Sequence, residues 1–267
     1  MTSKIIAITA DRGIPKTSLE QLSKQTSLPL LTPKIQADYL LHLSIEYLEL
    51  RKVIKSEKTN KQKIESIHID FATGKANHRR LHGGGKGQDI AKAIGLHKIK
   101  NPSVLDLTAG MGSDAFVLAS LGCDVELIER NAIVHALLDD ALVRASLSAD
   151  SDLQSILSRM TLHHSDSISV LENINNENQP DVIYFDPMFP ERNKSAQVKK
   201  EMQFFHDIVG NDEDSETVLL EALNKAKKRI VVKRPRLAEQ LTKMIQPAFV
   251  ISGKSTRYDV YLPQTSA

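Results

Sequence analysis

Residues 186–190 carry the groups best suited to catalysis. They form the motif Asp-Pro-Met-Phe-Pro at the end of an apolar run, residues 182–186, that predicts a buried strand. The Asp186 carboxylate, with a backbone carbonyl near Pro187, can accept both N–H groups of an exocyclic amine and orient its lone pair toward an electrophile. Phe189 can stack on the base that carries this amine. We therefore expect Asp186, Pro187 and Phe189 to be catalytic, with a plain Asp-Pro turn as the alternative.

A glycine-containing turn provides a candidate cofactor loop. Gly110 and Gly112 follow a predicted strand at residues 104–107 and open a predicted helix at residues 112–121. Glycines let a backbone turn tightly and approach a ligand, and a helix N-terminus presents unpaired N–H groups. The spacing up to Ala115 also fits the loose dinucleotide fingerprint, so this motif is a weak signal by itself. A turn that binds no ligand is the alternative.

Carboxylates near the carboxyl ends of successive predicted strands favour one class of cofactor. They are Asp106, Asp114, Glu129 and Asp166. Glu129 can accept hydrogen bonds from both hydroxyls of a ribose, although a solvated strand-end carboxylate is the alternative. The negative charge disfavours the pyrophosphate of NAD and favours the sulfonium and ammonium groups of S-adenosylmethionine. We therefore expect S-adenosylmethionine rather than a dinucleotide.

The elements that position these residues alternate between strands and helices from Pro102 onward. Predicted strands lie at residues 104–107, 124–129, 161–163, 182–186 and 229–233, with helices at 112–121 and 132–147 and a closing hairpin at 249–252 and 257–262. This alternation predicts a parallel sheet covered on both faces. The first 70 residues predict a small α+β unit that includes a hairpin of residues 39–43 and 47–51. We expect an N-terminal domain at residues 1–74, a basic connector with a short helix at 75–100, and a larger domain at 101–267.

Charge is distributed unevenly along the 267 residues, although the net charge is only +2. The net charge is +9 over residues 51–100, −11 over residues 101–190 and +4 over residues 191–267. This pattern indicates a surface that faces a polyanion beside an acidic site. A single cysteine, Cys123, excludes an internal disulfide and a cysteine-clustered zinc site. With no apolar run long enough to span a membrane, a reducing cytoplasmic setting is expected.

Three basic groups are candidate RNA contacts. The first is interleaved with glycines, the second follows the Asp-Pro motif and the third ends a predicted strand. They comprise His78, Arg79, Arg80 and Lys86, then Lys194, Lys199 and Lys200, then Lys233 and Arg234. Guanidinium and backbone N–H groups can follow a phosphate backbone. A solvated linker is the alternative for the first group. The pair His163-His164 lacks a third ligand at a suitable spacing, so we expect no metal.

Taken together, these motifs resemble the family of ribosomal RNA small subunit methyltransferase J. The resemblance extends from about Leu48 to the C-terminus. It rests on Asp106-x-Thr-Ala-Gly-Met-Gly-Ser-Asp-Ala-Phe, Glu129-Arg130-Asn131, Asp186-Pro-Met-Phe-Pro, Lys199-Lys-Glu-Met202, His78-Arg-Arg-x-x-Gly-Gly-Gly-x-Gly87 and Val231-Val-Lys-Arg-Pro235.

The resemblance implies a Rossmann-like S-adenosylmethionine-dependent methyltransferase fold, an α/β domain with a seven-stranded mixed sheet and a small α+β N-terminal domain. It also implies methylation of the N2 of one guanosine near the 3′ end of 16S rRNA, with rRNA or the ribosomal subunit as partner. Ser113 and Asp114 would contact the methyl donor, and Glu129 and Arg130 would hold its ribose and adenine region. Asp166 and Ser167 would lie by the adenine, and Asp186 would close the site. The family can have Arg at the position of Ser113, so we expect Ser113 to contact the donor through its backbone.

Other functions are open at this point. An amino-methyltransferase acting on adenine N6 or on a protein glutamine would use the same Asp-Pro motif. A NAD-dependent oxidoreductase fits the glycine loop but gives the Asp-Pro motif and the basic flanks no role. A non-enzymatic rRNA-binding factor would bind rRNA without binding the donor. The sequence does not specify an oligomeric state.

Overall fold

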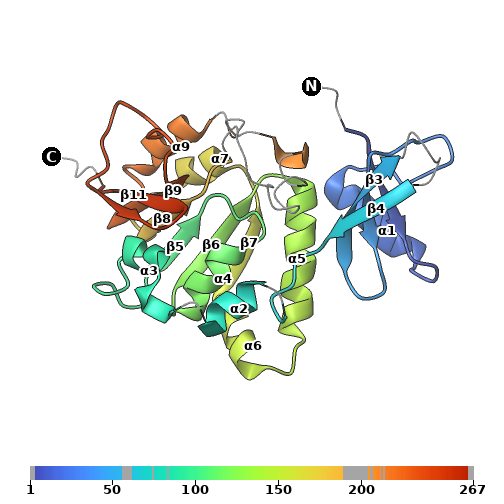
Figure 1. Cartoon of the computed structure of the whole chain (residues 1–267), viewed down its shortest axis with the longest axis horizontal. Coiled ribbons are helices and arrows are strands. Elements are labelled where there is room, and N and C mark those ends of the chain that lie inside the picture. Colours follow the sequence, from blue (N-terminus) through green and yellow to red (C-terminus); the bar gives the residue numbers. More distant parts are fainter. Residues whose placement is uncertain are drawn as a thin grey trace.

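Two sheets organise the chain in the computed structural model, which describes residues 4–55, 62–73, 75–82, 84–188, 204, 207–210, 212 and 214–263. The smaller sheet lies on one side of helix α5 (Ala132–Ser146) and the larger sheet on the other (Figure 1). The larger sheet carries the candidate site.

The larger sheet is mixed, with seven strands in the described part of the chain. They are β5 (Ser103–Asp106), β6 (Asp124–Glu129), β7 (Met160–His164), β8 (Val182–Phe185), β9 (Arg229–Pro235), β10 (Phe249–Ser252) and β11 (Thr256–Tyr261). Their order is β10-β11-β9-β8-β5-β6-β7. β11 is antiparallel to β9 and β10, and the other neighbours are parallel. The predicted strands and closing hairpin are confirmed, and the strand order reverses at β5, where such sheets bind ligands.

Helices cover both faces of this sheet because its strands are apolar on both sides. In β8, Val182 and Tyr184 point to one face and Ile183 and Phe185 to the other, and all four are buried. The first face packs against α3 (Asp89–Ile94), α4 (Ser113–Ser120), α5 and α6 (Ser151–Leu157). The second packs against α7 (Ser167–Glu172) and α9 (Ser215–Ala222). The sequence pattern did not predict α6 and α7.

The connector predicted at residues 75–100 has more structure than its glycines indicated. Helix α2 (Lys75–His82) and a 3-10 turn (Gly85–Gly87) precede α3. Within α2, Arg80 Nε donates to Asn77 Oδ1 at 2.8 Å. Arg80 also pairs with Asp150 of the larger domain at 3.4 Å. Because α2 is stabilised by such polar contacts, it lacks the apolar periodicity that reveals a helix in a sequence.

The smaller sheet has the order β1-β2-β3-β4 in the described residues and packs beside one helix, α1 (Lys16–Thr26). Its strands are β1 (Ile6–Ala10), β2 (Tyr39–Leu43), β3 (Leu48–Lys55) and β4 (Gln62–Ile67). The predicted hairpin is confirmed as the antiparallel pair of β2 and β3. The sheet packs on α5, where the Leu48 N–H donates to Asp140 Oδ2 at 3.1 Å.

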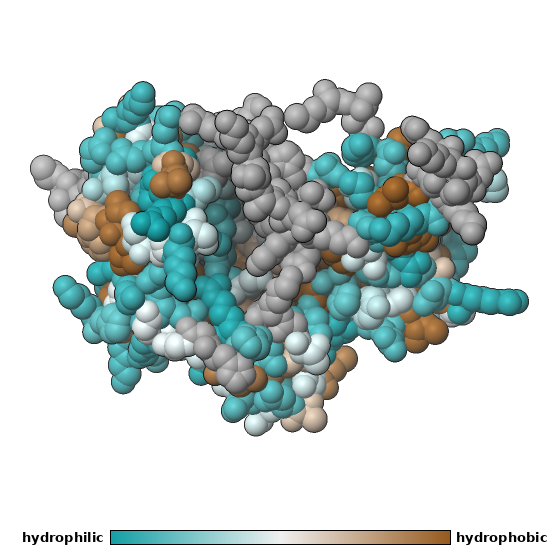
Figure 2. All heavy atoms as spheres, in the orientation of Figure 1, coloured by the Kyte–Doolittle hydropathy of each residue, from teal (hydrophilic) through white to brown (hydrophobic). Residues whose placement is uncertain are grey.

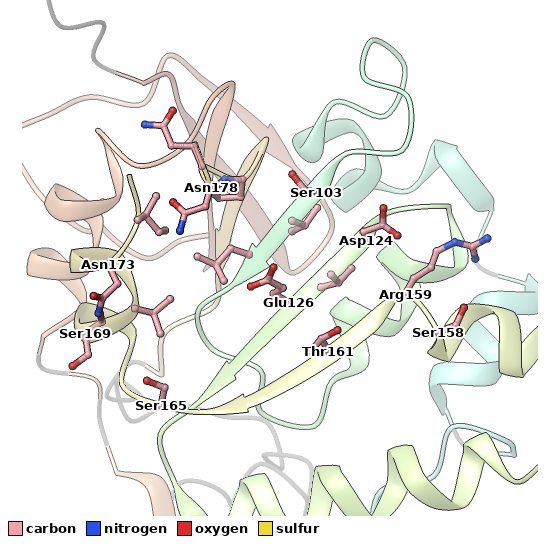
Figure 3. Close-up of a pocket in the computed structure, with 17 residues that line it drawn as sticks. Ser103, Asp124, Glu126, Ser158, Arg159, Thr161, Ser165, Ser169, Asn173 and Asn178 are labelled. Carbon is pink, nitrogen blue, oxygen red and sulfur yellow. The ribbon is translucent and has the colours of Figure 1, made fainter. Parts of the chain in front are cut away.

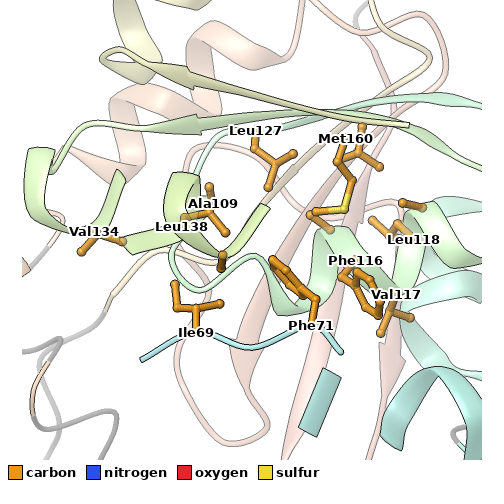
Figure 4. Packing of buried hydrophobic residues seen from close by; sticks show 14 of the residues in the cluster. Ile69, Phe71, Ala109, Phe116, Val117, Leu118, Leu127, Val134, Leu138 and Met160 are labelled. Atoms are coloured by element: carbon orange, nitrogen blue, oxygen red, sulfur yellow. The ribbon is translucent and has the colours of Figure 1, made fainter. Parts of the chain in front are cut away.

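Two residues that follow β4 are part of the core of the larger domain. Ile69 and Phe71 lie among side chains of α4 and α5, and Figure 4 shows Phe71 beside Phe116. The two rings stack with their centroids 4.9 Å apart. The boundary predicted after residue 74 therefore lies just beyond these two anchors.

The visible surface is largely hydrophilic, with dispersed apolar side chains (Figure 2). No helix among the described residues is long and apolar enough to cross a membrane.

Candidate active site

The larger sheet brings charged side chains together at its carboxyl edge. Asp106 ends β5, Glu129 ends β6, Asp186 follows β8, and Lys233 lies near the end of β9. These strands are parallel neighbours, so their carboxyl ends share one edge. Asp114 joins them from the first turn of α4.

Lys233 connects two of these carboxylates. Its Nζ lies 2.8 Å from Asp114 Oδ2 and 2.7 Å from Asp186 Oδ2. Asp114 also accepts hydrogen bonds from Arg79 Nη1 at 2.5 Å and from the Tyr184 hydroxyl at 2.7 Å. Asp114 is therefore fixed by three donors, whereas the Asp186 side chain remains 39% exposed and accessible to a substrate.

The surroundings shift the pKa values of Asp114, Lys233 and Asp186 in different directions. Burial alone would raise the pKa of Asp114, but Lys233 and Arg79 outweigh it and hold this pKa well below its usual range. Burial alone would lower the pKa of Lys233, but Asp186 and Asp114 outweigh it and raise this pKa. Partial removal of water raises the pKa of Asp186, although Lys233 opposes the shift. Asp186 is thus a better proton acceptor than an exposed aspartate.

Asp106 is the most deeply buried carboxyl group of the site. Its side chain accepts one hydrogen bond from the Thr108 N–H at 3.0 Å, and the residue is only 2% exposed. Burial raises its pKa to about 8, with a further increase from the nearby negative charges of Asp114 and Asp186. The group is therefore mostly uncharged at neutral pH, and a cation placed nearby would favour its ionisation.

Glu129 and the glycine turn hold each other in place. Glu129 Oε2 accepts the Gly110 N–H at 3.0 Å, and Oε1 accepts the Asn131 N–H at 2.8 Å. Gly112 has a φ of +68°, and a Cβ there would lie 2.8 Å from Leu138 Cδ1. At Gly110, with a φ of +52°, the nearest atom to such a Cβ would be 3.8 Å away. The turn is thus packed tightly at Gly112 and open at Gly110.

Asp166 and Ser167 follow β7 and lie at the start of α7. The Asp166 carboxylate caps α7 by accepting the N–H groups of Ile168 and Ser169 at 2.9 and 3.2 Å. The Ser167 hydroxyl donates to the Leu107 carbonyl at 2.8 Å. Both residues therefore have structural contacts near the loop after β5, and their predicted contact with adenine stays a prediction.

Two side chains of this site were missed by sequence reasoning. The Thr108 hydroxyl accepts the backbone N–H of Asp186 at 2.7 Å and so links the glycine turn to the catalytic motif. The Tyr184 hydroxyl donates to Asp114. A tyrosine in the otherwise apolar run of β8 was a usable signal, because a buried tyrosine hydroxyl requires a partner.

The arrangement fits a cationic donor such as S-adenosylmethionine. Asp114, Glu129 and Asp186 outnumber the cations Lys233 and Arg79, which neutralise part of their charge, and a bound cation would favour ionisation of Asp106 as well. The open side of Gly110 lets a ligand approach the backbone beside Glu129. A sulfonium and an ammonium group are favoured there, whereas a pyrophosphate is not.

Comparisons with known proteins agree with this chemistry. A family model described as SAM-dependent methyltransferase matches residues 21–263. The ribosomal RNA small subunit methyltransferase J of Cellvibrio japonicus is 50% identical over 77% of this chain and 78% of its own length. The protein of that name from Marinobacter nauticus is 45% identical over 94% of this chain and 88% of its own length. The chain belongs to this methyltransferase family.

A solved structure extends the similarity to the whole fold. The crystal structure of a SAM-dependent methyltransferase from Neisseria gonorrhoeae has a TM-score of 0.73 and 31% sequence identity, covering 98% of this chain and 97% of its own. The Rossmann-like methyltransferase fold expected from the sequence is therefore confirmed. The methyltransferase uses S-adenosylmethionine as its methyl donor.

The predicted RNA contacts lie in different environments in this methyltransferase. His78 and Lys86 are exposed. Arg79 pairs with Asp114 and Arg80 with Asp150, so both also have structural contacts.

Two predicted contacts near the end of β9 do not have the expected surface position. Lys233 lies inside the site between two carboxylates. Arg234 is only 5% exposed and its Nη2 donates to the Glu239 carbonyl at 2.5 Å, so it does not rim the crevice. Neighbouring residues of a strand point to opposite faces, and of these two residues Arg234 is the buried one.

Two further predicted donor contacts are Arg130 and Ser113, and their contact with the donor stays a prediction. Arg130 pairs with Asp212 and with Asp214, the latter at 2.7 Å. Ser113 is exposed at the start of α4. Phe189, Lys194, Lys199 and Lys200 lie outside the described residues.

A hollow of about 500 Å³ lies elsewhere on the sheet. Figure 3 shows its lining, which includes Ser103, Asp124 and Glu126 from the amino halves of β5 and β6. It contains none of the predicted site residues, so we do not assign the methyl donor to it. Among the described residues, no group of three His, Cys, Asp or Glu side chains is placed to hold a metal ion.

Proposed function

We propose that this methyltransferase transfers a methyl group from S-adenosylmethionine to the N2 of one guanosine in 16S rRNA, leaving S-adenosylhomocysteine. The names of the curated relatives support rRNA of the small subunit as the substrate. The position of Asp186 supports an exocyclic amine as the acceptor: its carboxylate is partly exposed directly after β8, beside the acidic donor site. Methylation of ribosomal RNA would take place in the cytoplasm.

Asp186 is the group that orients the amine. The N2 lone pair of guanine is delocalised into the ring, so the amine is a weak nucleophile until its N–H groups are held by acceptors. The Asp186 carboxylate accepts one N–H, and the backbone carbonyl beside it is available for the other. Bound S-adenosylmethionine supplies a methyl group on a positively charged sulfur.

Asp186 is also suited to take the proton that the amine loses. Its raised pKa makes it a stronger base than an exposed aspartate. Lys233 remains protonated and holds one oxygen of Asp186, which restricts the carboxylate to one orientation. Thr108 fixes the backbone of Asp186, because its hydroxyl accepts the Asp186 N–H. These contacts fix the Asp186 carboxylate in position before the substrate arrives. Such positioning is the main contribution a protein makes to this kind of methyl transfer.

Replacement of Asp186 tests the proposal. With tritiated S-adenosylmethionine and 16S rRNA that lacks the modification, the wild type should label the rRNA. Asp186→Ala should lower turnover by at least about 100-fold, because orientation and proton removal are both lost. Its affinity for the donor, measured by calorimetry, should stay within about tenfold of wild type.

The exposed strand residue Glu126, replaced by Ala, is a matched control that should retain activity. A large loss of donor affinity in Asp186→Ala would make Asp186 a donor-binding residue. Absence of label from rRNA with a folded, donor-binding wild type would contradict the proposed substrate.

A further inference from the structure

The catalytic turn is paired with a segment that begins helix α9. Met188, two residues after Asp186, donates its N–H to Asp212 Oδ2 at 2.7 Å. The Asp212 N–H donates back to the Met188 carbonyl at 3.2 Å. The position of the backbone around Pro187 therefore depends on the position of Asp212.

Asp212 is fixed from two sides. Its backbone carbonyl accepts the Ser215 hydroxyl at 2.5 Å, which attaches it to the start of α9. Its carboxylate pairs with Arg130 Nη2, and the Asp212 side chain is only 13% exposed. Arg130 Nη1 binds Asp214 at 2.7 Å. The guanidinium therefore holds Asp212 and Asp214 at once, as a planar fork can.

The backbone around Arg130 is held in place by its neighbours. It directly follows Glu129, whose two oxygens accept the N–H groups of Gly110 and Asn131. Asn131 caps α5 with its side-chain oxygen. The end of β6 is thus a rigid support, and Arg130 connects it to the catalytic turn through Asp212.

We propose that Arg130 and Asp212 form a positioning pair for the catalytic turn, so that Arg130 acts on the methyl acceptor side of the reaction and not as a ligand of the methyl donor. The inference rests on the proposed function, since it assigns the pair to the turn that holds the target amine. Loss of Asp212 removes the acceptor of the Met188 N–H, and loss of Arg130 removes the cation that holds the Asp212 carboxylate in place. Either change allows the Pro187 carbonyl and Asp186 to move, while Glu129 keeps its contacts with the glycine turn.

Four variants test this pair. Arg130→Ala and Asp212→Ala should each lower kcat by about 10- to 100-fold, because small displacements of a positioning group have effects of this size. Their double variant should lose no more than either single variant, because both act through one contact. Arg130→Lys should recover part of the loss, since an ammonium can still pair with Asp212. Donor affinity by calorimetry should stay within about threefold of wild type in all four.

Asp214→Ala is the matched control. It removes the second ion pair of Arg130 but leaves Asp212 and its contacts with Met188 intact. It should keep kcat within about threefold of wild type, which separates loss of the Met188 contact from loss of surface charge.

Hydrogen exchange at the Met188 amide provides a readout that needs no substrate. Exchange should be faster in Arg130→Ala and Asp212→Ala than in wild type, and unchanged in Asp214→Ala. If Arg130→Ala does not fold, Arg130→Lys and Asp212→Asn, which preserve size, are measured in its place.

A tenfold or larger loss of donor affinity in Arg130→Ala with kcat retained would overturn the inference and make Arg130 a donor ligand. Unchanged Met188 exchange would also overturn it. An inactive wild type would contradict the proposed rRNA substrate, and the exchange measurement would still decide the role of the pair.

Discussion

Carboxyl groups of one residue type perform different tasks in this site because their neighbours differ. Asp114 has three donors and a lowered pKa, which makes it a permanent anion that orients Lys233 and Arg79. Asp186 has one cation and a raised pKa, which suits a proton acceptor. Asp106 has the pKa of about 8 that burial produces.

Asp106→Asn should stabilise the fold, increasingly so toward alkaline pH. The pKa of Asp106 is raised to about 8 in the folded protein, so the unfolded chain ionises first as pH rises above about 4. The folding stability associated with this carboxyl is therefore fully present below pH 4 and is lost as pH rises to 8. Asparagine keeps an acceptor for the Thr108 N–H and does not ionise, so the variant avoids this loss. At pH 8 its free energy of unfolding should exceed that of wild type by roughly 1 kcal/mol or more, which corresponds to an increase in Tm of about 2–4 °C.

Thermal unfolding at pH 5 and pH 8.5 measures this difference. The gain of Asp106→Asn over wild type should be larger at pH 8.5. A gain that does not depend on pH, or a variant less stable than wild type at pH 8.5, would show that Asp106 is already ionised in the fold.

At the residue scale, sequence reasoning found the acidic groups but not their partners. Asp106, Glu129 and Asp186 were recognisable because each follows an apolar strand run. Lys233 and Arg234 looked equivalent, because adjacent residues of a strand point to opposite faces and the sequence does not say which face holds the site. The register of β9 with β11 places Lys233 opposite Tyr258 and Arg234 opposite Arg257.

At the scale of elements, the glycine turn between β5 and α4 combines a packing requirement with an opening for a ligand. Gly112 lies against Leu138 and Phe71 of the core, whereas a Cβ at Gly110 would meet only the Thr108 carbonyl, at 3.8 Å. The turn therefore connects the stability of the domain to the geometry of the site.

Substitution of the two glycines should separate these roles. Gly112→Ala should destabilise the fold by about 1–3 kcal/mol, because its Cβ overlaps the core and its positive φ is unfavourable for alanine. Gly110→Ala should cost less stability but weaken donor binding, since its Cβ enters the open space. Denaturant unfolding and donor calorimetry measure both, and equal stability losses in the two variants would contradict this division.

Helices and strands could be predicted from the sequence where their burial leaves a pattern of apolar residues. Strand β8 reads as four buried apolar residues and was predictable. Helix α2 is polar, and two of its contacts, Arg79 with Asp114 and Arg80 with Asp150, join residues far apart in sequence. Contacts between residues so far apart leave no pattern in the local sequence, so α2 could not be predicted from it. The number of strands in the sheet also depends on long-range pairing, so the seven-stranded mixed sheet was expected from the resemblance to a family and not from the local pattern.

At the scale of the whole molecule, the charge distribution separates two binding tasks. Residues 101–190 have a net charge of −11, and the segments before and after them have +9 and +4. A cationic donor and a polyanionic rRNA can therefore be bound by one chain with a net charge of only +2.

Salt should distinguish the two ligands. Raising salt from about 50 to about 200 mM should weaken rRNA binding by at least about tenfold, because each phosphate contact releases counterions. Donor affinity should change by less than about twofold, since it involves few exposed charges. The exposed Lys86, replaced by Glu, should reduce the salt dependence of rRNA binding, whereas Lys227→Glu, at an exposed position before β9, should not. Equal salt dependence for both ligands would contradict the separation.

Identification of the methylated nucleoside tests the central claim most directly. Unmodified 16S rRNA is incubated with the protein and S-adenosylmethionine, digested to nucleosides and separated by mass spectrometry against standards. The site geometry and the family predict N2-methylguanosine, formed by wild type and absent with Asp186→Ala. Methyl groups on adenine N6 or on another position, or an rRNA that gains no methyl group, would contradict it.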